Sequence, residues 1–272
     1  MKLDAARAAE ISLEAVEAGA GTATLLLVSG EAAGGRLLLV VAPDGTETVH
    51  GTLGSPVLDD AGVGVARAAV DDPRHRDGLH ALTPEHEAYL EVRRPVPDLV
   101  IVGAGHIARP MCRVGDDLGF RVWVLDDRPD FATRERFPDA HAVVQGDFSD
   151  PFRDIPIHER THFLLVTRGH KYDYDCLVRI LRADPAPAYI GMIGSRRRVR
   201  ATFVQLLEEG FPVERLHDIH APVGLDVGAE TPEEIAVAVA AELVLVRRGG
   251  TGTPLRDKER VAERFFGNME EA

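Results

Sequence analysis

Apolar runs and amphipathic stretches alternate in the first third of the chain. Residues 3–18 show helical periodicity, with an apolar stripe of Ala6, Ala9, Leu13 and Val16. A second helix is predicted from the spacing of Val63, Ala66 and Val70. Apolar, β-prone runs separated by turn residues predict a small antiparallel sheet from residues 22–28, 36–42, 46–53 and 88–92. Residues 1–95 are therefore predicted to form a small α+β domain.

The pattern changes after Pro95 and Pro97, where apolar strands begin to alternate with amphipathic helices. The predicted strands are residues 99–102, 121–125, 142–144, 163–166 and 189–193. This alternation is typical of a parallel sheet built from βαβ units. A capping box at Thr231 and Glu234 begins a last helix, which ends at Gly249.

The predicted fold class is therefore α/β, with a Rossmann-like, mostly parallel sheet and a small N-terminal α+β domain. Residues 96–250 form the Rossmann-like domain. Residues 251–272 are a charged tail that we expect to be flexible, apart from a short ordered segment at residues 261–266.

Composition narrows the class of protein further. The chain has 272 residues, of which 45% are hydrophobic and 28% charged, as in folded globular proteins. Acidic residues outnumber basic ones by 44 to 31, and the net charge of −13 disfavours binding to nucleic acid. No export signal and no apolar run of roughly 18 residues is visible, so we expect no membrane association. The two distant cysteines, Cys112 and Cys176, fit a protein of the reducing cytoplasm.

The strongest motif follows the strand at residues 99–102. It reads G-x-G-x-x-A, with Gly103 and Gly105 in the turn and a helix directly after it. In such a turn the first glycine permits a tight bend and the second allows a phosphate to approach the backbone. A phosphate is therefore expected against the backbone of residues 103–107, which includes His106 and Ile107. Asp126 ends the next strand, 23 positions after Gly103, where an acid that binds ribose is expected, and Arg128 lies beside it.

Polar clusters also follow the later predicted strands. Because parallel strands direct their carboxyl ends to one crevice, we expect these clusters to converge on the glycine turn. The candidate ligands there are Thr167, His170, Ser195, Arg196, His220 and Asp226. Arg196 is the favoured anion ligand, whereas a solvated helix face is predicted for Arg197, Arg198 and Arg200.

Two other motifs are not interpreted as sites. His158 and His162 match H-E-x-x-H, but a proline precedes them and a predicted strand follows at once, so no zinc helix fits. Cys112 and Cys176 are predicted to be buried in helices rather than to act as nucleophiles. The sequence therefore predicts a binding crevice, assigns no catalytic group and predicts no metal site.

Five stretches, in order, resemble the XdhC/CoxI family: LVIVGAGHIA from residue 99, LDDRPDF from 125, YIGMIGSRRR from 189, PVGLDVG from 222 and AETPEE from 229. This resemblance implies an accessory factor for molybdenum hydroxylases such as xanthine dehydrogenase. Such a protein binds the molybdenum cofactor (molybdopterin), protects it during sulfuration by a cysteine desulfurase and helps to insert it into the apoenzyme. The family also implies a homodimer.

The N-terminal domain departs from the family in one segment. Relatives usually carry a glycine-rich stretch that ends in Cys-Val-Glu or His-Leu-Glu, whereas residues 51–59 here read GTLGSPVLD, without a cysteine or histidine. Two alternatives to the accessory role use the same domain. An NAD(P)-dependent oxidoreductase would use the same crevice, and a scaffold for protein contacts would bind no nucleotide.

Overall fold

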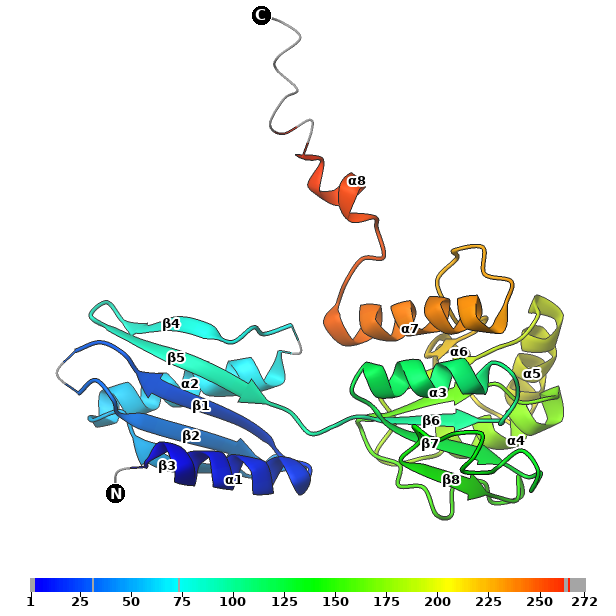
Figure 1. The fold of residues 1–272 in the computed structure, drawn as a ribbon, viewed down its shortest axis with the longest axis horizontal. Coiled ribbons are helices and arrows are strands. Elements are labelled where there is room, and N and C mark those ends of the chain that lie inside the picture. Colours follow the sequence, from blue (N-terminus) through cyan, green and yellow to red (C-terminus); the bar gives the residue numbers. More distant parts are fainter. Residues whose placement is uncertain (1–2, 31, 73, 262–263, 265–272) are drawn as a thin grey trace, which may run out of the picture. The chain divides into compact units, whose positions relative to one another are not determined.

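In the computed structural model, residues 3–30, 32–72, 74–261 and 264 are described. They form two compact units (Figure 1), the first of residues 1–98 with 119–121 and the second of the remaining residues. The described helices include none that is long and apolar enough to cross a membrane.

The first unit contains the predicted antiparallel sheet. Its helices are α1 (Ala5–Glu17) and α2 (Pro56–Asp71). Its strands are β1 (Gly21–Leu27), β2 (Arg36–Val41), β3 (Glu47–Thr52), β4 (Gly78–Thr83) and β5 (His86–Arg93). They pair antiparallel in the order β3-β2-β1-β5-β4. Strand β4 was not predicted, because its alternating exposed positions leave it without a clear apolar pattern.

Strand β1 has buried residues on both of its faces, because Thr22 and Ala23, which point to opposite faces, are both covered. Ala23, Leu25 and Leu27 pack in one core with the apolar side of α2. Thr22 instead meets α1, where its hydroxyl lies 2.6 Å from that of Ser12. The predicted apolar stripe of α1 was wrong, because Ala6, Ala9 and Leu13 are exposed and Val16 is only partly buried. The buried positions are Ala8 and Ser12.

The second unit contains the predicted Rossmann-like sheet. Its strands are β6 (Asp98–Val102), β7 (Arg121–Asp126), β8 (Ala142–Gln145), β9 (Thr161–Leu165), β10 (Tyr189–Met192) and β11 (Ile219–His220). Its helices are α3 (Ala108–Asp117), α4 (His170–Leu181), α5 (Arg196–Glu208), α6 (Val213–His217), α7 (Pro232–Arg248) and α8 (Leu255–Glu259). The two-residue strand β11 was not predicted.

The sheet order is β8-β7-β6-β9-β10-β11, which places the first strand of the unit in the middle. The chain therefore runs outward from β6 in one direction and later returns to fill the other side, which is the arrangement of dinucleotide-binding folds. Helices α3 and α7 contact each other, as do α4 and α5, and the two pairs cover opposite faces of the sheet (Figure 1). The topological switch point lies between β6 and β9, where ligands of this fold bind.

Two connections contain no helix. Turns and loops link β7 to β8 and β8 to β9 across the described residues 127–141 and 146–160. Phe148, Phe152 and Ile155 from the second connection are buried in the core with α4 and α5. These loops therefore supply apolar surface next to the carboxyl ends of the strands.

Helix α7 has the predicted start and end. Thr231 and Glu234 form both hydrogen bonds of the capping box, and Gly249 ends the helix in a left-handed conformation with φ 62°. In the tail the structure contains α8, which was not predicted. Most of the predicted segment at residues 261–266 lies outside the described residues.

Candidate functional site

Gly103 lies at the switch point, and its backbone conformation and close neighbours leave no room for a side chain at this position. Its φ is +108°, and a Cβ there would lie 2.7 Å from the backbone oxygen of Val166. Its N–H donates to the Leu125 carbonyl at 2.7 Å. A Cβ on Gly105 would meet nothing within 4 Å, so the backbone here borders open space. The two glycines therefore have different tasks, since Gly103 allows the chain to turn and Gly105 leaves room beside the turn.

The helices that begin at this crevice have free N-termini. Side-chain oxygens of Asp4, Ser55, Ser195 and Thr231 cap the other four described helices of ten residues or more. Among the described residues, no side chain caps α3 or α4, which begin after Ile107 and Gly169. Backbone N–H groups at an uncapped helix start attract anions. Both helices therefore offer backbone N–H donors at this end of the sheet.

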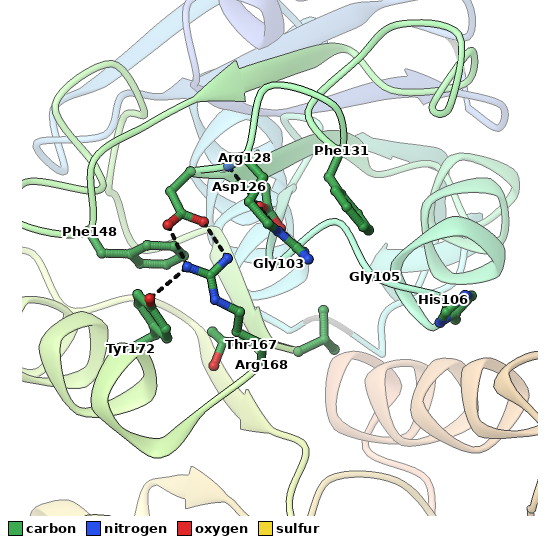
Figure 2. Close-up of a pocket in the computed structure, with 12 residues that line it drawn as sticks. Gly103, Gly105, His106, Asp126, Arg128, Phe131, Phe148, Thr167, Arg168 and Tyr172 are labelled. Carbon is green, nitrogen blue, oxygen red and sulfur yellow. Dashed lines mark hydrogen bonds and ion pairs between the residues drawn. The ribbon is translucent and has the colours of Figure 1, made fainter.

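A cavity of about 240 Å³ lies against this turn (Figure 2). Six of the predicted residues line it: Gly103, Gly105, His106, Asp126, Arg128 and Thr167. These residues come from the ends of β6, β7 and β9 and from the loop before α3. The structure thus brings together half of the candidate ligands that the sequence indicated.

Asp126 supports the glycine turn from within the protein. It is 2% exposed, and its Oδ2 accepts a hydrogen bond of 2.7 Å from the Ala104 N–H. Arg128 donates to the same carboxylate from Nε at 2.8 Å and from Nη2 at 2.9 Å. Burial by itself would raise the pKa of Asp126, but the hydrogen bonds from Arg128 and Ala104 lower it to about 2. The carboxylate is therefore ionised and already holds both the loop and the Arg128 guanidinium.

Arg168 and Tyr172 lie at one side of the cavity (Figure 2), which Asp127 also lines. Arg168 donates to both carboxylate oxygens of Asp127, at 3.0 and 2.7 Å, and to the Tyr172 hydroxyl at 2.6 Å. Phe148 packs against Tyr172 with ring centroids 4.7 Å apart. Opposite charges thus neutralise each other here, and aromatic rings supply apolar surface.

Sequence reasoning missed six residues that line the cavity: Asp127, Phe131, Phe148, Val166, Arg168 and Tyr172. Asp127, Arg168 and Val166 directly adjoin predicted ligands, so their position at the strand ends was an available signal. Phe148 gave no such signal, because it lies in a loop that only the tertiary structure brings to the crevice.

The other predicted ligands lie outside the lining of this cavity. Ile107 and His170 stand at the starts of α3 and α4, and Ser195 caps α5. Arg196 is the exposed first residue of α5. His220 pairs with Glu242 through Nδ1 at 2.8 Å, and Asp226 is exposed in the loop between β11 and α7.

Arg198 does not belong to a solvated helix face as predicted. Its side chain is 22% exposed and its Nε donates to the buried Asp173 at 2.6 Å. It also donates from Nη2 to the carbonyl oxygen of Thr167 at 3.0 Å. Arg198 therefore connects α5 to the turn between β9 and α4. The prediction for Arg198 was wrong because its partner Asp173 lies 25 positions away in the sequence.

The rejected motifs have the expected local structure. Residues 158–160 form a turn and His162 lies in β9, so no helix presents both histidines. Cys112 and Cys176 are 1% and 0% exposed within α3 and α4. Across the part of the chain that the structure describes, no group of three or more His, Cys, Asp or Glu side chains is placed to hold a metal ion.

The chain is similar in sequence to two known proteins. The chain is 32% identical over 165 residues to an uncharacterized protein YqeB of Escherichia coli (strain K12), covering 60% of this chain and 30% of that protein. It is 32% identical over 163 residues to a protein of Bacillus subtilis (strain 168) described as a probable subunit of xanthine dehydrogenase, covering 59% of this chain and 46% of that protein. The chain thus spans less than half the length of both relatives.

A solved structure shares the fold. The crystal structure of a xanthine dehydrogenase from Bacillus halodurans superimposes with a TM-score of 0.64 at 23% identity, covering 90% of this chain and 66% of that chain. The model of the XdhC Rossmann domain matches residues 99–243. That match includes the glycine turn, the cavity and most of α7. Because it covers more than half of the 272 residues, the chain belongs to the XdhC family.

Proposed function

We propose that this protein is an accessory factor for a molybdenum hydroxylase of the xanthine dehydrogenase type. It binds the molybdenum cofactor as cargo, protects it while a partner cysteine desulfurase sulfurates it, and helps to transfer it to the apoenzyme. The observation that carries the proposal is the pair of uncapped helices at the switch point, in a chain of the XdhC family. The cofactor itself supplies the redox chemistry of the client enzyme.

The crevice suits the phosphate of such a cargo. The starts of α3 and α4 offer backbone N–H groups, and α3 has one fewer because Pro110 in its first turn carries none. The open space beside Gly105 lets a phosphate approach the backbone closely. Net charge does not oppose this, because local N–H groups determine the field inside a crevice.

The same cavity suits a flat ring system. Phe131, Phe148 and Tyr172 line it, and the Arg128 guanidinium lies 3.6 Å from the centroid of the Phe131 ring. Aromatic surface of this kind excludes water from a bound ring. A carrier needs no general acid or base, since its task is to bind the cargo and then release it to a partner with higher affinity.

The chain's own cysteines are unsuited to carrying sulfur. Burial raises the pKa of Cys112 to about 12, and burial also raises the pKa of Cys176. A persulfide carrier instead needs an accessible thiolate with a lowered pKa. Residues 51–59, where relatives carry a cysteine or histidine, run from the end of β3 into the start of α2, with Ser55 as the cap of that helix. We therefore assign the reactive thiol to the partner desulfurase.

The oxidoreductase alternative is less well supported by Asp126. In that alternative the carboxylate would accept hydrogen bonds from a ribose. Both of its oxygens already accept from Ala104 and Arg128. Titration of the purified protein with NAD(P)H and, separately, with molybdopterin distinguishes the two functions, and saturable binding of NAD(P)H alone would favour the oxidoreductase.

Purification of the full chain from molybdate-replete cells that make the cofactor tests the proposal. We expect bound pterin and molybdenum in the wild-type protein and their loss in Gly105→Val, whose side chain would fill the space beside the turn. Gly64→Val is the matched control, because Gly64 is exposed in α2 and a Cβ there also meets nothing within 4 Å. Wild-type protein without pterin, or equal pterin in Gly105→Val, would contradict the proposal.

The sulfur assignment has its own test. We expect the Cys112→Ala, Cys176→Ala double variant to support full activation of a reconstituted hydroxylase in the presence of its desulfurase. Alanine keeps both buried positions small and apolar. A folded double variant that binds the cofactor but cannot support activation would show that this chain transfers sulfur itself.

A further inference from the structure

A second, larger cavity of about 460 Å³ lies next to the first in the same unit. His106 lines both cavities, so they adjoin at the loop before α3. The second cavity extends along α3, whose Arg109 and Arg113 face it, to the loop that carries Arg136. Neither the glycine motif nor any predicted ligand other than His106 points to it.

The cations of this cavity are available for a ligand. Arg109 and Arg113 are one helical turn apart on α3, and the side chain of neither forms an ion pair or hydrogen bond with another described residue. In the first cavity, by contrast, Arg128 and Arg168 are paired with Asp126 and Asp127. Unpaired arginines can form the short charge-assisted hydrogen bonds that phosphates accept.

Arg136 joins the two cavities. Its Nη2 donates to the carbonyl oxygen of Ala104 in the glycine turn at 3.2 Å. Its Cζ lies 4.7 Å from the centroid of the Phe131 ring, which lines the first cavity. Its Nε is buried and has no hydrogen-bond partner in the described structure. Asp139 and Glu233 also line the second cavity, so three arginines face two carboxylates there.

We propose that Arg109, Arg113 and Arg136 form a second anion subsite that binds the next phosphate of a ligand whose first phosphate lies at the glycine turn. The inference rests on the proposed function, because it takes the position of the first phosphate from it. The ligand class is thereby a diphosphate, such as a dinucleotide form of the cargo, rather than a monophosphate.

Calorimetric titration of the full chain with AMP and ADP, and with CMP and CDP, tests the subsite. The base is the same within each pair, so the difference in affinity reports the second phosphate. We expect each diphosphate to bind at least about tenfold more tightly than its monophosphate. In Arg109→Gln, Arg113→Gln this preference should fall to about twofold, with the affinity for the monophosphate retained.

Arg197→Gln, Arg200→Gln is the matched control, because it removes two exposed arginines of α5 that are unpaired among the described residues of the same unit. It should keep the preference for diphosphates. Equal affinity for monophosphate and diphosphate in the wild type, or a preference that survives in Arg109→Gln, Arg113→Gln, would overturn the subsite alone. If no nucleotide binds while pterin copurifies with the protein, the subsite is overturned and the proposed function stands. If neither nucleotide nor pterin binds, both are overturned.

Discussion

The ends of β6 and β10 look alike in sequence but differ in what they offer a ligand. Each strand runs into a glycine-containing turn and then a helix, and cationic residues follow in both. After β6 the helix start is uncapped, and the turn before it lines the cavity. After β10, Ser195 caps α5 and Arg198 is paired with Asp173. A polar cluster at a strand end can bind a ligand only where its donors are not already used by other groups of the protein.

Substitution of the two glycines of the β6 turn should give the largest contrast. Gly103→Ala should lower the free energy of unfolding by about 4 kcal/mol, because positive φ and contact with the Val166 backbone both oppose a Cβ. Gly105→Ala should change it by less than about 0.5 kcal/mol, since its Cβ would enter open space. Urea unfolding measures both values. Similar losses of unfolding free energy in the two variants would show that Gly103 and Gly105 do not have the different roles described above.

Arg198→Ala should have the next largest effect and tests whether the β10–α5 end is structural. It would leave the Asp173 carboxylate, which is 0% exposed, without its cation, at a loss of about 3 kcal/mol in the free energy of unfolding. Arg197→Ala, on the exposed part of α5, should cost less than about 0.5 kcal/mol. If both variants unfold at the same urea concentration, the ion pair between Arg198 and Asp173 does not stabilise the fold.

Asp126 makes the stability of the β6 end depend on pH. Its folded pKa of about 2 lies below the usual value of 3.8, so ionisation stabilises the fold above about pH 4 and this contribution is lost as pH falls through 2. The contribution amounts to about 2 kcal/mol. The difference in free energy of unfolding between wild type and Asp126→Asn should therefore shrink between pH 4 and pH 2. A difference that is constant over this interval would mean that the carboxylate is not held as described.

Ser195→Ala should produce the smallest change and separates capping from binding. Loss of the hydrogen bond from the Arg198 N–H to Ser195 Oγ should cost about 1 kcal/mol in the free energy of unfolding. Pterin content after purification should not change, because Ser195 does not line the cavity. Loss of pterin from a folded Ser195→Ala protein would instead indicate that Ser195 binds the cofactor, as the sequence predicted.

The interpretation from sequence worked well where the signal was local. The G-x-G-x-x-A turn, the capping box of α7 and the alternation of strands and helices each depend on residues close together in the chain. It failed for Arg198, whose partner Asp173 comes from another helix, and for α1, whose buried side is set by the sheet that it covers. Helical periodicity identified that helix but not the side that becomes buried.

The parallel sheet of the second unit and the glycine turn could be predicted from the sequence alone. These follow from apolar periodicity and from backbone conformations that only glycine adopts readily. Which charged side chains remain free to bind a ligand depends on the tertiary structure. Asp126 and Arg128 neutralise each other, whereas Arg109 and Arg113 have no partner among the described residues. The physical reason is that the availability of a charge depends on distances between side chains that folding brings together, and spacing along the chain does not encode those distances.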